Sequence, residues 1–134
     1  MARPDEPTDL LRRTLMALLP TFVWGADAAA QDASKMQPDS YRVVLETDRL
    51  RVLDFLSRPG MGMCGIGMHS HPPHLTVALT AAKVRVRNAD GTTFVGENQP
   101  GDVFWDEAVT HTTENILGRN ARALIVELKA PKCR

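Results

Sequence analysis

The sequence is poor in cysteine, in net charge and in long apolar runs. Its 134 residues include two cysteines, Cys64 and Cys133, which are too few and too far apart for a disulfide scaffold or a zinc cluster of paired thiolates. The 16 basic and 16 acidic residues cancel, so no global charge draws the chain to nucleic acid or anionic lipid. We therefore expect no nucleic-acid partner and at most one disulfide bond, between Cys64 and Cys133.

The start of the chain has the composition of an export signal. An apolar run from Leu15 to Trp24 follows Arg12 and Arg13 and gives way to small residues up to position 30. A basic start, a short apolar run and a small-residue cleavage site are typical of a signal peptide, and the paired arginines resemble the twin-arginine signal. About ten apolar residues are only half of what a bilayer-spanning helix needs. We therefore expect no permanent membrane anchor.

This interpretation divides the chain into a signal-like segment (1–30), a linker (31–40) and one domain (41–130), and it predicts a periplasmic or secreted protein. The acidic residues Asp5, Glu6 and Asp9 are unusual in a signal peptide. The alternatives are an amphipathic helix that packs on the domain, or a start codon placed too early. Either alternative leaves the protein cytoplasmic.

The pattern of the domain is that of strands. Short apolar runs are separated by turn residues every 8 to 12 positions, and no convincing helix is present. The run Asn88-Ala89-Asp90-Gly91 is the strongest hairpin turn, because glycine accepts the positive φ of a tight turn. Eight or nine strands without helices indicate an all-β sandwich or small barrel. The predicted strands include 41–47, 49–57, 69–80, 83–87, 103–105, 111–116 and 121–128.

Four histidines carry most of the candidate chemistry, and three of them lie within six residues. His69 and His71 are two residues apart in a predicted strand, so their side chains point to the same face. Two imidazoles in that arrangement can bind one divalent metal ion. His111 completes the set if its strand also faces the barrel interior. An isolated His-x-His pair is a weak signal, but the clustering favours a metal site at these three residues.

Around these histidines the sequence resembles the cupin superfamily of small metal-binding β-barrels. The run from Met63 to His71 matches the ligand half of the first cupin motif, and His111 to Asn115 matches the H-x-x-x-N end of the second. Between them, Pro100 to Trp105 is similar to the turn and strand that lead to the second histidine. The resemblance covers about residues 42–129 and implies a double-stranded β-helix, the cupin jelly roll.

Two further runs, 69–73 and 126–129, are similar to small single-domain cupins of the β-alanine degradation protein-like type. That likeness implies a fold and a ligand set more than a reaction.

One departure from the cupin motif concerns charge. The motif's glutamate would fall at Leu75 or Thr76, and neither carries a carboxylate. The resemblance then implies three neutral imidazoles, as in three-histidine cupins of the thiol dioxygenase type. A divalent ion without a carboxylate ligand keeps its full +2 charge, so it binds anionic ligands more strongly and acidifies a bound water more.

The identity of the metal stays open between Fe, Mn and Zn. Met61, Met63 and Met68 lie near the histidines and suit copper. Methionines in a glycine-rich run are more often adaptable packing residues, so Cu and Ni are less favoured.

His74 has two possible positions. It is out of alternation with His69 and His71, which places it at the pocket rim or in solvent. Pro72 and Pro73 cannot hold a regular ladder, and a bulge there would reset the alternation and make His74 a fourth ligand.

The remaining candidates are pocket or supporting residues. Thr76 is a candidate pocket residue, and Asn115 supports the site or the end of its strand through its amide. One of Phe104 and Trp105 is expected to line the cavity while the other packs or stays exposed. Glu107 either covers the mouth of the pocket or is solvated.

Three classes of function are open at this point. The first is a metal-dependent enzyme acting on a small, anionic or oxygen-bearing molecule: a dioxygenase type with Fe(II), or hydration, isomerisation or decarboxylation with Zn or Mn. The second is a non-catalytic module that binds or senses a small molecule. The third is a structural protein in which the metal ion only stabilises the barrel. Exposed edge strands favour a homodimer, which single cupins commonly form.

Overall fold

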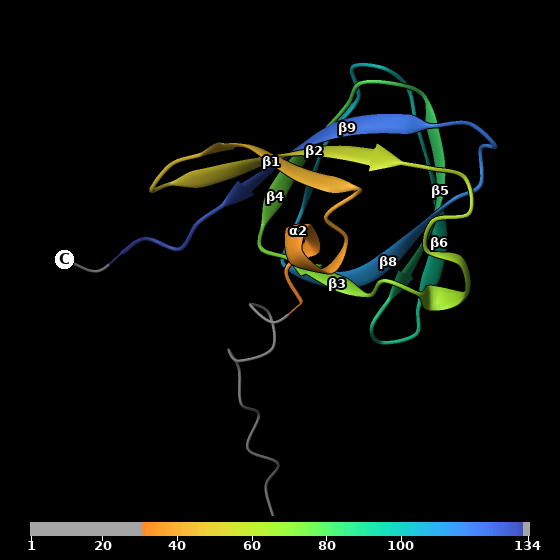
Figure 1. Cartoon of the computed structure of the whole chain (residues 1–134), viewed down its shortest axis with the longest axis horizontal. Helices are drawn as coiled ribbons and strands as arrows, with labels where there is room; N and C mark the ends of the chain where they lie inside the picture. Colours follow the sequence, from red (N-terminus) through yellow and green to blue (C-terminus); the bar gives the residue numbers. More distant parts are fainter. Residues whose placement is uncertain (1–30, 133–134) are drawn as a thin grey trace, which may run out of the picture.

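Two antiparallel sheets face each other and enclose the interior of the domain (Figure 1). The computed structural model describes residues 31–132. One sheet has the order β1-β2-β9-β4-β7 and the other the order β3-β8-β5-β6. The prediction of a small all-β barrel is therefore confirmed. The strands are β1 (Tyr41–Glu46), β2 (Leu50–Ser57), β3 (His69–His71), β4 (His74–Ala78), β5 (Ala82–Asn88), β6 (Thr93–Asn98), β7 (Val103–Asp106), β8 (Val109–Asn115) and β9 (Ala121–Leu128).

The hairpin predicted at Asn88–Gly91 joins β5 and β6. The Gly91 N–H donates to the Asn88 carbonyl at 3.0 Å, and Gly91 has a φ of +88°. A side chain is strained at such a φ, so the glycine at this position lets the two strands meet through a short turn.

The segment 69–80, predicted as one strand, is two strands in different sheets. β3 pairs with β8, whereas β4 pairs with β7 and β9. Pro72 and Pro73 lie between them, and proline has no N–H to donate to a ladder. Strand pairing therefore ends at His71, and the chain crosses to the opposite sheet before His74.

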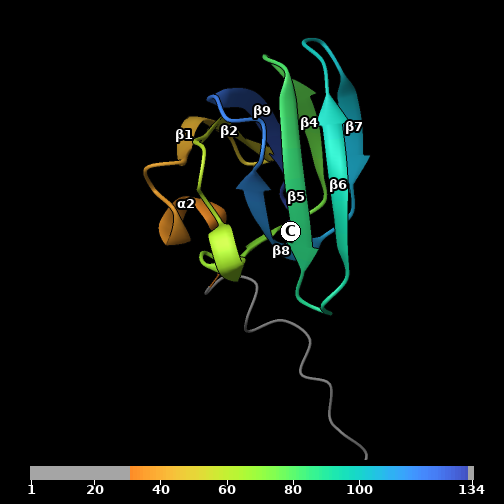
Figure 2. The ribbon, with the colours of Figure 1, turned by 90° about the vertical axis from the view of Figure 1, so that its right-hand side faces the viewer.

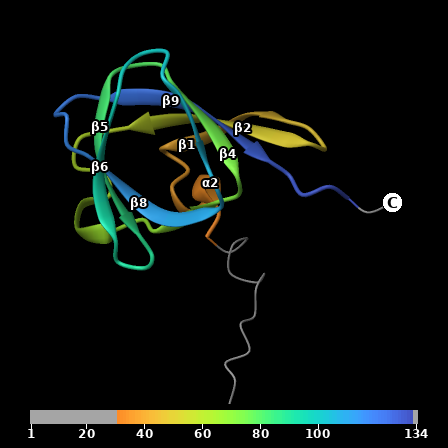
Figure 3. The same cartoon turned by 180° about the vertical axis from the view of Figure 1, so that it is seen from behind.

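Residues 31–40, expected to be a linker, instead pack on the barrel. The helix α2 (Ala33–Met36) begins after Asp32, whose carboxylate accepts a hydrogen bond from the Ser34 N–H at 3.0 Å. Ala33 is buried in one cluster with Tyr41, Leu53 and Ile125. Figures 1 and 3 show α2 lying against β1 and β3, which agrees with its contacts to these two strands.

The β1–β2 hairpin extends beyond the barrel on the side away from β5 and β6 (Figures 1 and 3). Among the residues of β1, Val43, Val44 and Leu45 are exposed. β1 is also an edge strand of its sheet.

Some predictions fall outside the described residues. The signal-like segment 1–30 and Cys133 are among them, so export and the Cys64–Cys133 bond stay predictions. Within residues 31–132, no helix is both long and apolar enough to cross a membrane.

Candidate metal centre

His69, His71 and His111 meet inside the barrel. His69 and His111 are directly opposite each other in the β3–β8 pair, and His71 follows two residues after His69. The candidate ligand nitrogens of the three side chains lie within 4.8 Å of one another. Two nitrogens bound to one ion at about 2.1 Å are roughly 3 to 4 Å apart, so a small inward movement of the rings suits a metal. The three residues therefore fit an imidazole-ligated divalent ion.

Hydrogen bonds fix the rings of two of these histidines. The Nδ1–H of His71 donates to Glu127 Oε1 at 2.6 Å, and the Nδ1–H of His69 donates to the Gly67 carbonyl at 2.7 Å. A carbonyl or carboxylate oxygen only accepts, so Nδ1 carries the proton in both rings. The Nε2 lone pair of each ring is then directed away from these partners, as in metal-bound histidines held by a backbone oxygen or carboxylate.

Burial keeps the imidazoles neutral. Desolvation lowers the pKa of His69 to about 4 and that of His111 to about 3. The same cause lowers the pKa of His74. Because an unperturbed histidine titrates near 6.5, these three rings are uncharged at neutral pH. A neutral imidazole is the form that binds a metal.

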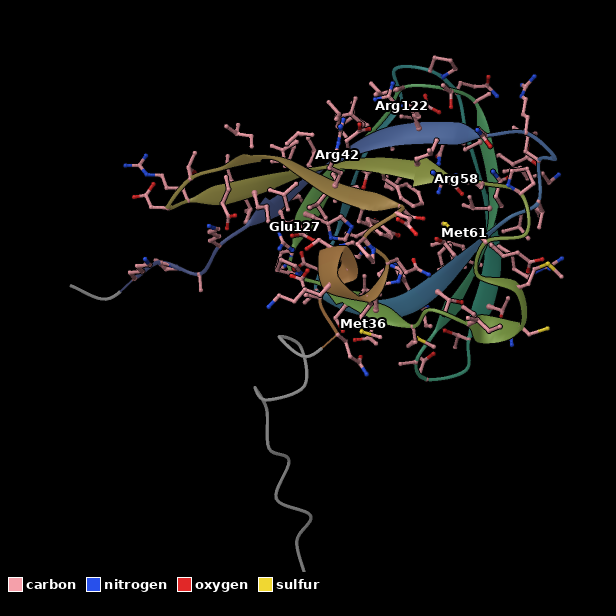
Figure 4. The ribbon with its side chains drawn as sticks, viewed as in Figure 1. Met36, Arg42, Arg58, Met61, Arg122 and Glu127 are labelled. Carbon is pink, nitrogen blue, oxygen red and sulfur yellow. The ribbon has the colours of Figure 1, made fainter. Side chains whose placement is uncertain are left out.

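A carboxylate that the sequence analysis did not select lies directly behind His71. Glu127 is 1% exposed and stands opposite Arg51 in the β2–β9 pair. The Arg51 Nε–H donates to Glu127 Oε2 at 2.8 Å, and the same guanidinium donates to Asp32 Oδ2 at 2.7 Å. Figure 4 shows Glu127 between α2 and the β1–β2 hairpin. A chain of contacts thus links the start of α2 to the metal centre.

This chain of contacts corrects the expectation that the +2 charge of the ion is not offset. The three potential ligands include no carboxylate. However, Glu127, Arg51 and Asp32 together carry one negative charge next to His71. The sequence held a signal for Glu127, since it shares the inward alternation of β9 with Ala121, Ala123 and Ile125. A charged residue at an inward position needs a buried partner.

Tyr41 is the second residue that sequence reasoning missed. Its hydroxyl donates to His69 Nε2 at 3.0 Å, and its ring stacks on Phe55 with centroids 4.5 Å apart. Burial raises the pKa of Tyr41, so the hydroxyl keeps its proton. The Tyr41 hydroxyl donates to the Nε2 lone pair of His69, which is the lone pair that a metal ion would need. Metal binding at His69 therefore requires the Tyr41 hydroxyl to turn to another acceptor. Its only sequence signal is that it is the single tyrosine of the chain.

His74 is buried beside the cluster, and it belongs neither to the rim nor to the group of three potential ligands. Its ring centroid is 4.9 Å from that of His71. Its Nδ1–H donates to the Pro72 carbonyl at 2.8 Å, and its Nε2 lies 3.6 Å from Asp106 Oδ2. The expected rim or solvent position is wrong because the chain crosses between sheets before His74, which resets the alternation.

The other predicted pocket residues separate into two groups. Thr76 and Phe104 line the cavity described below. Trp105 is exposed and its Nε1–H donates to Glu107 Oε1 at 2.8 Å. Glu107 is also exposed, and neither residue lines the cavity. Of the two aromatic candidates, Phe104 is therefore the one that faces the ligand space.

Asn115 supports the end of its strand and not the metal centre. Its amide donates to the carbonyls of Ser57, at 3.1 Å, and Arg119, at 2.8 Å. Its Oδ1 accepts from the Leu117 N–H at 2.9 Å. The second of the two roles expected for this amide is the one that the structure shows.

His71, His74 and His111 line a cavity of about 380 Å³ between the two sheets. This volume lies in the range of small-molecule sites, roughly 300 to 1,000 Å³. Its wall is mainly apolar, and polar residues line it both near the histidines and at the far end. The lining residues are Tyr41, Phe55, Ser57, His71, His74, Thr76, Ala78, Thr80, Ala82, Val84, Val86, Asn88, Phe94, Gly96, Asn98, Phe104, Asp106, Val109, His111, Thr113, Ala121, Arg122, Ala123 and Ile125.

The fold is shared with known structures. A cupin domain from Bordetella pertussis Tohama I is 20% identical to this chain with a TM-score of 0.59, and the match covers 67% of this chain and 92% of that one. A cupin protein from Bacteroides fragilis is 16% identical with a TM-score of 0.48, covering 71% and 80% of the two chains. The Fe(II) form of HppE in complex with its substrate is 13% identical with a TM-score of 0.48, covering 67% and 53%.

These similarities concern the fold. The B. pertussis domain, with a TM-score above 0.5, supports a small cupin jelly roll. The two structures with TM-scores below 0.5 carry no argument about chemistry or ligand. No family model and no curated protein sequence matches the chain. The resemblance to cupins is therefore confirmed for the fold.

Proposed function

We propose that this chain of cupin fold binds a divalent metal ion through His69, His71 and His111 and uses it on a small molecule held in the cavity. The observation that carries the proposal is the meeting of three side chains, two of them buried and His111 half-buried, whose ligand nitrogens lie within 4.8 Å of one another. Two of the rings are oriented through Nδ1, so Nε2 is the nitrogen that would bind the ion, at His69 once the Tyr41 hydroxyl has turned away. An all-imidazole set suits Fe, Mn or Zn.

When bound, the ion would supply Lewis acidity toward an anionic or oxygen-bearing group of the ligand and, if it is Fe(II), oxygen chemistry. The other groups around the cavity hold protons. Tyr41 keeps its proton at the hydroxyl oxygen, next to His69. His74 and Asp106 both line the cavity, and the His74 Nε2 lies 3.6 Å from Asp106 Oδ2. Glu127 keeps His71 in one orientation.

These proton-holding groups favour a metal-dependent enzyme, of the dioxygenase type if iron is bound, over a module that only binds a ligand. A binding module needs the metal and the shape of the cavity. It does not need a neutral tyrosine and a histidine–aspartate pair around the same space. Non-catalytic binding or sensing is the alternative that the second experiment below separates from turnover.

The first experiment tests the metal. We expect the purified protein to bind one equivalent of Fe(II), Mn(II) or Zn(II), and His111→Ala to weaken binding at least 100-fold by removing one of three ligands. His74→Ala is the matched control, because it removes a histidine of the same cavity that lies outside the group of three. Equal metal content in wild type and His111→Ala, measured by elemental analysis after dialysis, would exclude this site.

The second experiment tests turnover. The Fe(II)-loaded protein is incubated with small thiols, diketones and carboxylates while oxygen uptake is recorded, and the Zn(II)- and Mn(II)-loaded forms are assayed for product by mass spectrometry. We expect consumption of at least one class by wild type and none by His111→Ala. Ligand binding by calorimetry without consumption would identify a binding or sensing protein.

Export and dimerisation stay predictions. The exposed Val44 and Leu45 on the edge strand β1 are compatible with a second copy pairing there. Sedimentation of the protein at several concentrations tests the dimer. N-terminal sequencing of protein recovered from the periplasm tests the cleavage.

A further inference from the structure

The cavity has two unlike ends. Figure 4 shows Glu127 and Arg122 at opposite ends of β9. Glu127 belongs to the histidine end, through its bond to His71. Around Arg122 the cavity is lined by small side chains from four strands, and we call this part the small-residue end. Its members are Ala78, Ala82, Gly96, Ala121 and Ala123.

The register of the sheets shows that these small residues share one region. Ala78 is opposite Ala123 in the β4–β9 pair, and Ala121 is opposite Ser57 in the β2–β9 pair. In the other sheet, Gly96 is opposite Val84, two residues after Ala82. Side chains this short leave space between the sheets that larger residues would fill.

One buried hydroxyl at this end has no hydrogen-bond partner. Ser57 is fully buried and lines the cavity, and its Oγ makes no hydrogen bond to any of the described residues 31–132. Leu53 and Phe55 precede it on the same face of β2, so its side chain points inward with theirs. An unpaired buried hydroxyl costs about 1 to 3 kcal/mol. A ligand that supplied a hydrogen bond there would recover that cost.

Ser57 lies well away from the metal centre. Tyr41 contacts His69 through its hydroxyl and stacks on Phe55. Ser57 is two residues further along β2 than Phe55, about 7 Å at the usual rise of a strand. A ligand that reaches both the ion and Ser57 must therefore be elongated.

Two strands that are not paired with each other carry exposed aromatic residues of the cavity wall. β6 and β7 are edge strands of different sheets, and in Figure 2 β7 lies behind β6, further from the viewer. The cavity-lining residues Phe94, on β6, and Phe104, on β7, are 55% and 36% exposed. Exposed aromatic side chains at this edge suit the entry of an apolar molecule.

We propose that the ligand of this cavity is a small carboxylate whose apolar chain runs from the metal centre to the small-residue end and carries a hydroxyl or carbonyl group that meets Ser57. The proposal rests on the proposed function for the position of the carboxylate head. The apolar part and the contact with Ser57 rest on the cavity alone.

The length of the apolar part is tested with linear carboxylates from acetate to decanoate, titrated by calorimetry into the Zn(II)-loaded protein. Each added methylene that enters an apolar wall should raise the affinity about fourfold, until the chain outgrows the cavity. An affinity independent of chain length would overturn the proposal.

A variant that fills the small-residue end should shift this limit. A Cβ at Gly96 would meet only Val84, at 3.8 Å, so Gly96→Leu extends into the cavity without backbone strain. We expect it to bind acetate like wild type and octanoate at least tenfold more weakly. Val95→Leu is the control, because Val95 is the exposed neighbour that does not line the cavity. If Gly96→Leu does not fold, Ala82→Val serves the same purpose.

The contact with Ser57 is tested by comparing unsubstituted with ω-hydroxy carboxylates of the same length. Among the ω-hydroxy carboxylates, wild type should prefer the one whose chain length places the hydroxyl at Ser57. Ligands one methylene shorter or longer should bind more weakly. Ser57→Ala should lose this preference while its affinity for the unsubstituted series stays unchanged. Equal preferences in the two proteins would exclude Ser57 as a contact.

Failure of the metal site and failure of this inference give different results. Linear 1-alkanols need no metal, so they probe the apolar part in the metal-free protein and in His111→Ala. If alkanol affinity rises with chain length in these two proteins, and Gly96→Leu lowers the length at which it stops rising, the cavity proposal is supported even if no metal binds. If alkanol affinity does not depend on chain length while the protein still binds metal, the proposed ligand class is wrong and the proposed metal centre is unaffected.

Discussion

The histidine end and the small-residue end of the cavity differ in how their side chains are held. At the histidine end, buried polar groups are fixed by hydrogen bonds: His71 by Glu127, His69 by Gly67 and Tyr41. At the small-residue end, alanines and a glycine leave space, and the Ser57 hydroxyl makes no hydrogen bond to the described residues. The histidine end therefore holds its side chains in fixed positions, which metal binding requires. The small-residue end leaves space for a ligand.

This difference predicts unequal tolerance to substitution. A buried polar network is expensive to leave half satisfied, so nearly any change at the histidine end should destabilise the fold. An under-filled apolar region accepts a methyl group at little cost. Four changes test the comparison, from the largest expected effect to the smallest.

Glu127→Ala should have the largest effect. It leaves the Arg51 guanidinium and the His71 Nδ1–H without their buried carboxylate, and breaking such a pair costs about 3 to 5 kcal/mol of unfolding free energy. Urea denaturation measures the loss. Glu114→Ala is the control, since its partner Arg85 is well exposed, and should cost under about 1 kcal/mol. Similar losses in the two variants would contradict a special role for Glu127.

Gly67→Ala should come next. Gly67 has a φ of +83°, and a Cβ there would lie 1.9 Å from the Gln37 Nε2, which must move. The backbone strain costs on the order of 1 to 3 kcal/mol. Because the Gly67 carbonyl orients His69, zinc affinity should fall as well. Thermal unfolding and a zinc titration check both effects, and an unchanged affinity would show that this carbonyl does not position the ring.

Acidification should destabilise the metal-free protein. The pKa values of His69 and His111 in the folded state, about 4 and about 3, lie below the unfolded value of about 6.5. The unfolded state therefore binds more protons, so stability is full above about pH 6.5 and falls as the pH drops toward the folded pKa values.

Urea unfolding at pH 7.5, 5.5 and 4.5 with a chelator present should show a loss on the order of 1 to 3 kcal/mol. His111→Gln should show a shallower dependence on pH. A slope unchanged in this variant would mean that His111 does not contribute.

Gly96→Ala should have the smallest effect. Gly96 does not have a positive φ, and the added Cβ makes one ordinary contact with Val84. Replacing a glycine in such a conformation is neutral or stabilising by up to about 1 kcal/mol, because it restricts the unfolded chain. A melting temperature several degrees below that of wild type would show that this end is already well packed.

The sequence predicted the metal centre better than its surroundings. His69 and His71 share a face because side chains alternate along a strand, which is a local property. The hydrogen bond between His71 and Glu127 joins residues 56 positions apart, and no local pattern specifies that register. The position of His74 stayed open between two alternatives because alternation places a side chain only while the strand continues, and the chain changes sheets between Pro72 and His74. Tyr41 had no motif of its own.

The sequence by itself determined most of the strands, the Asn88–Gly91 turn and the shared face of His69 and His71, because alternation and turn chemistry act over a few neighbouring residues. Only the tertiary structure decided that β3 and β8 bring His69 opposite His111, that Glu127 and Arg51 meet behind His71, and that small residues from four strands line one end of the cavity. Those placements depend on the pairing of distant strands, which the packing of the whole barrel sets.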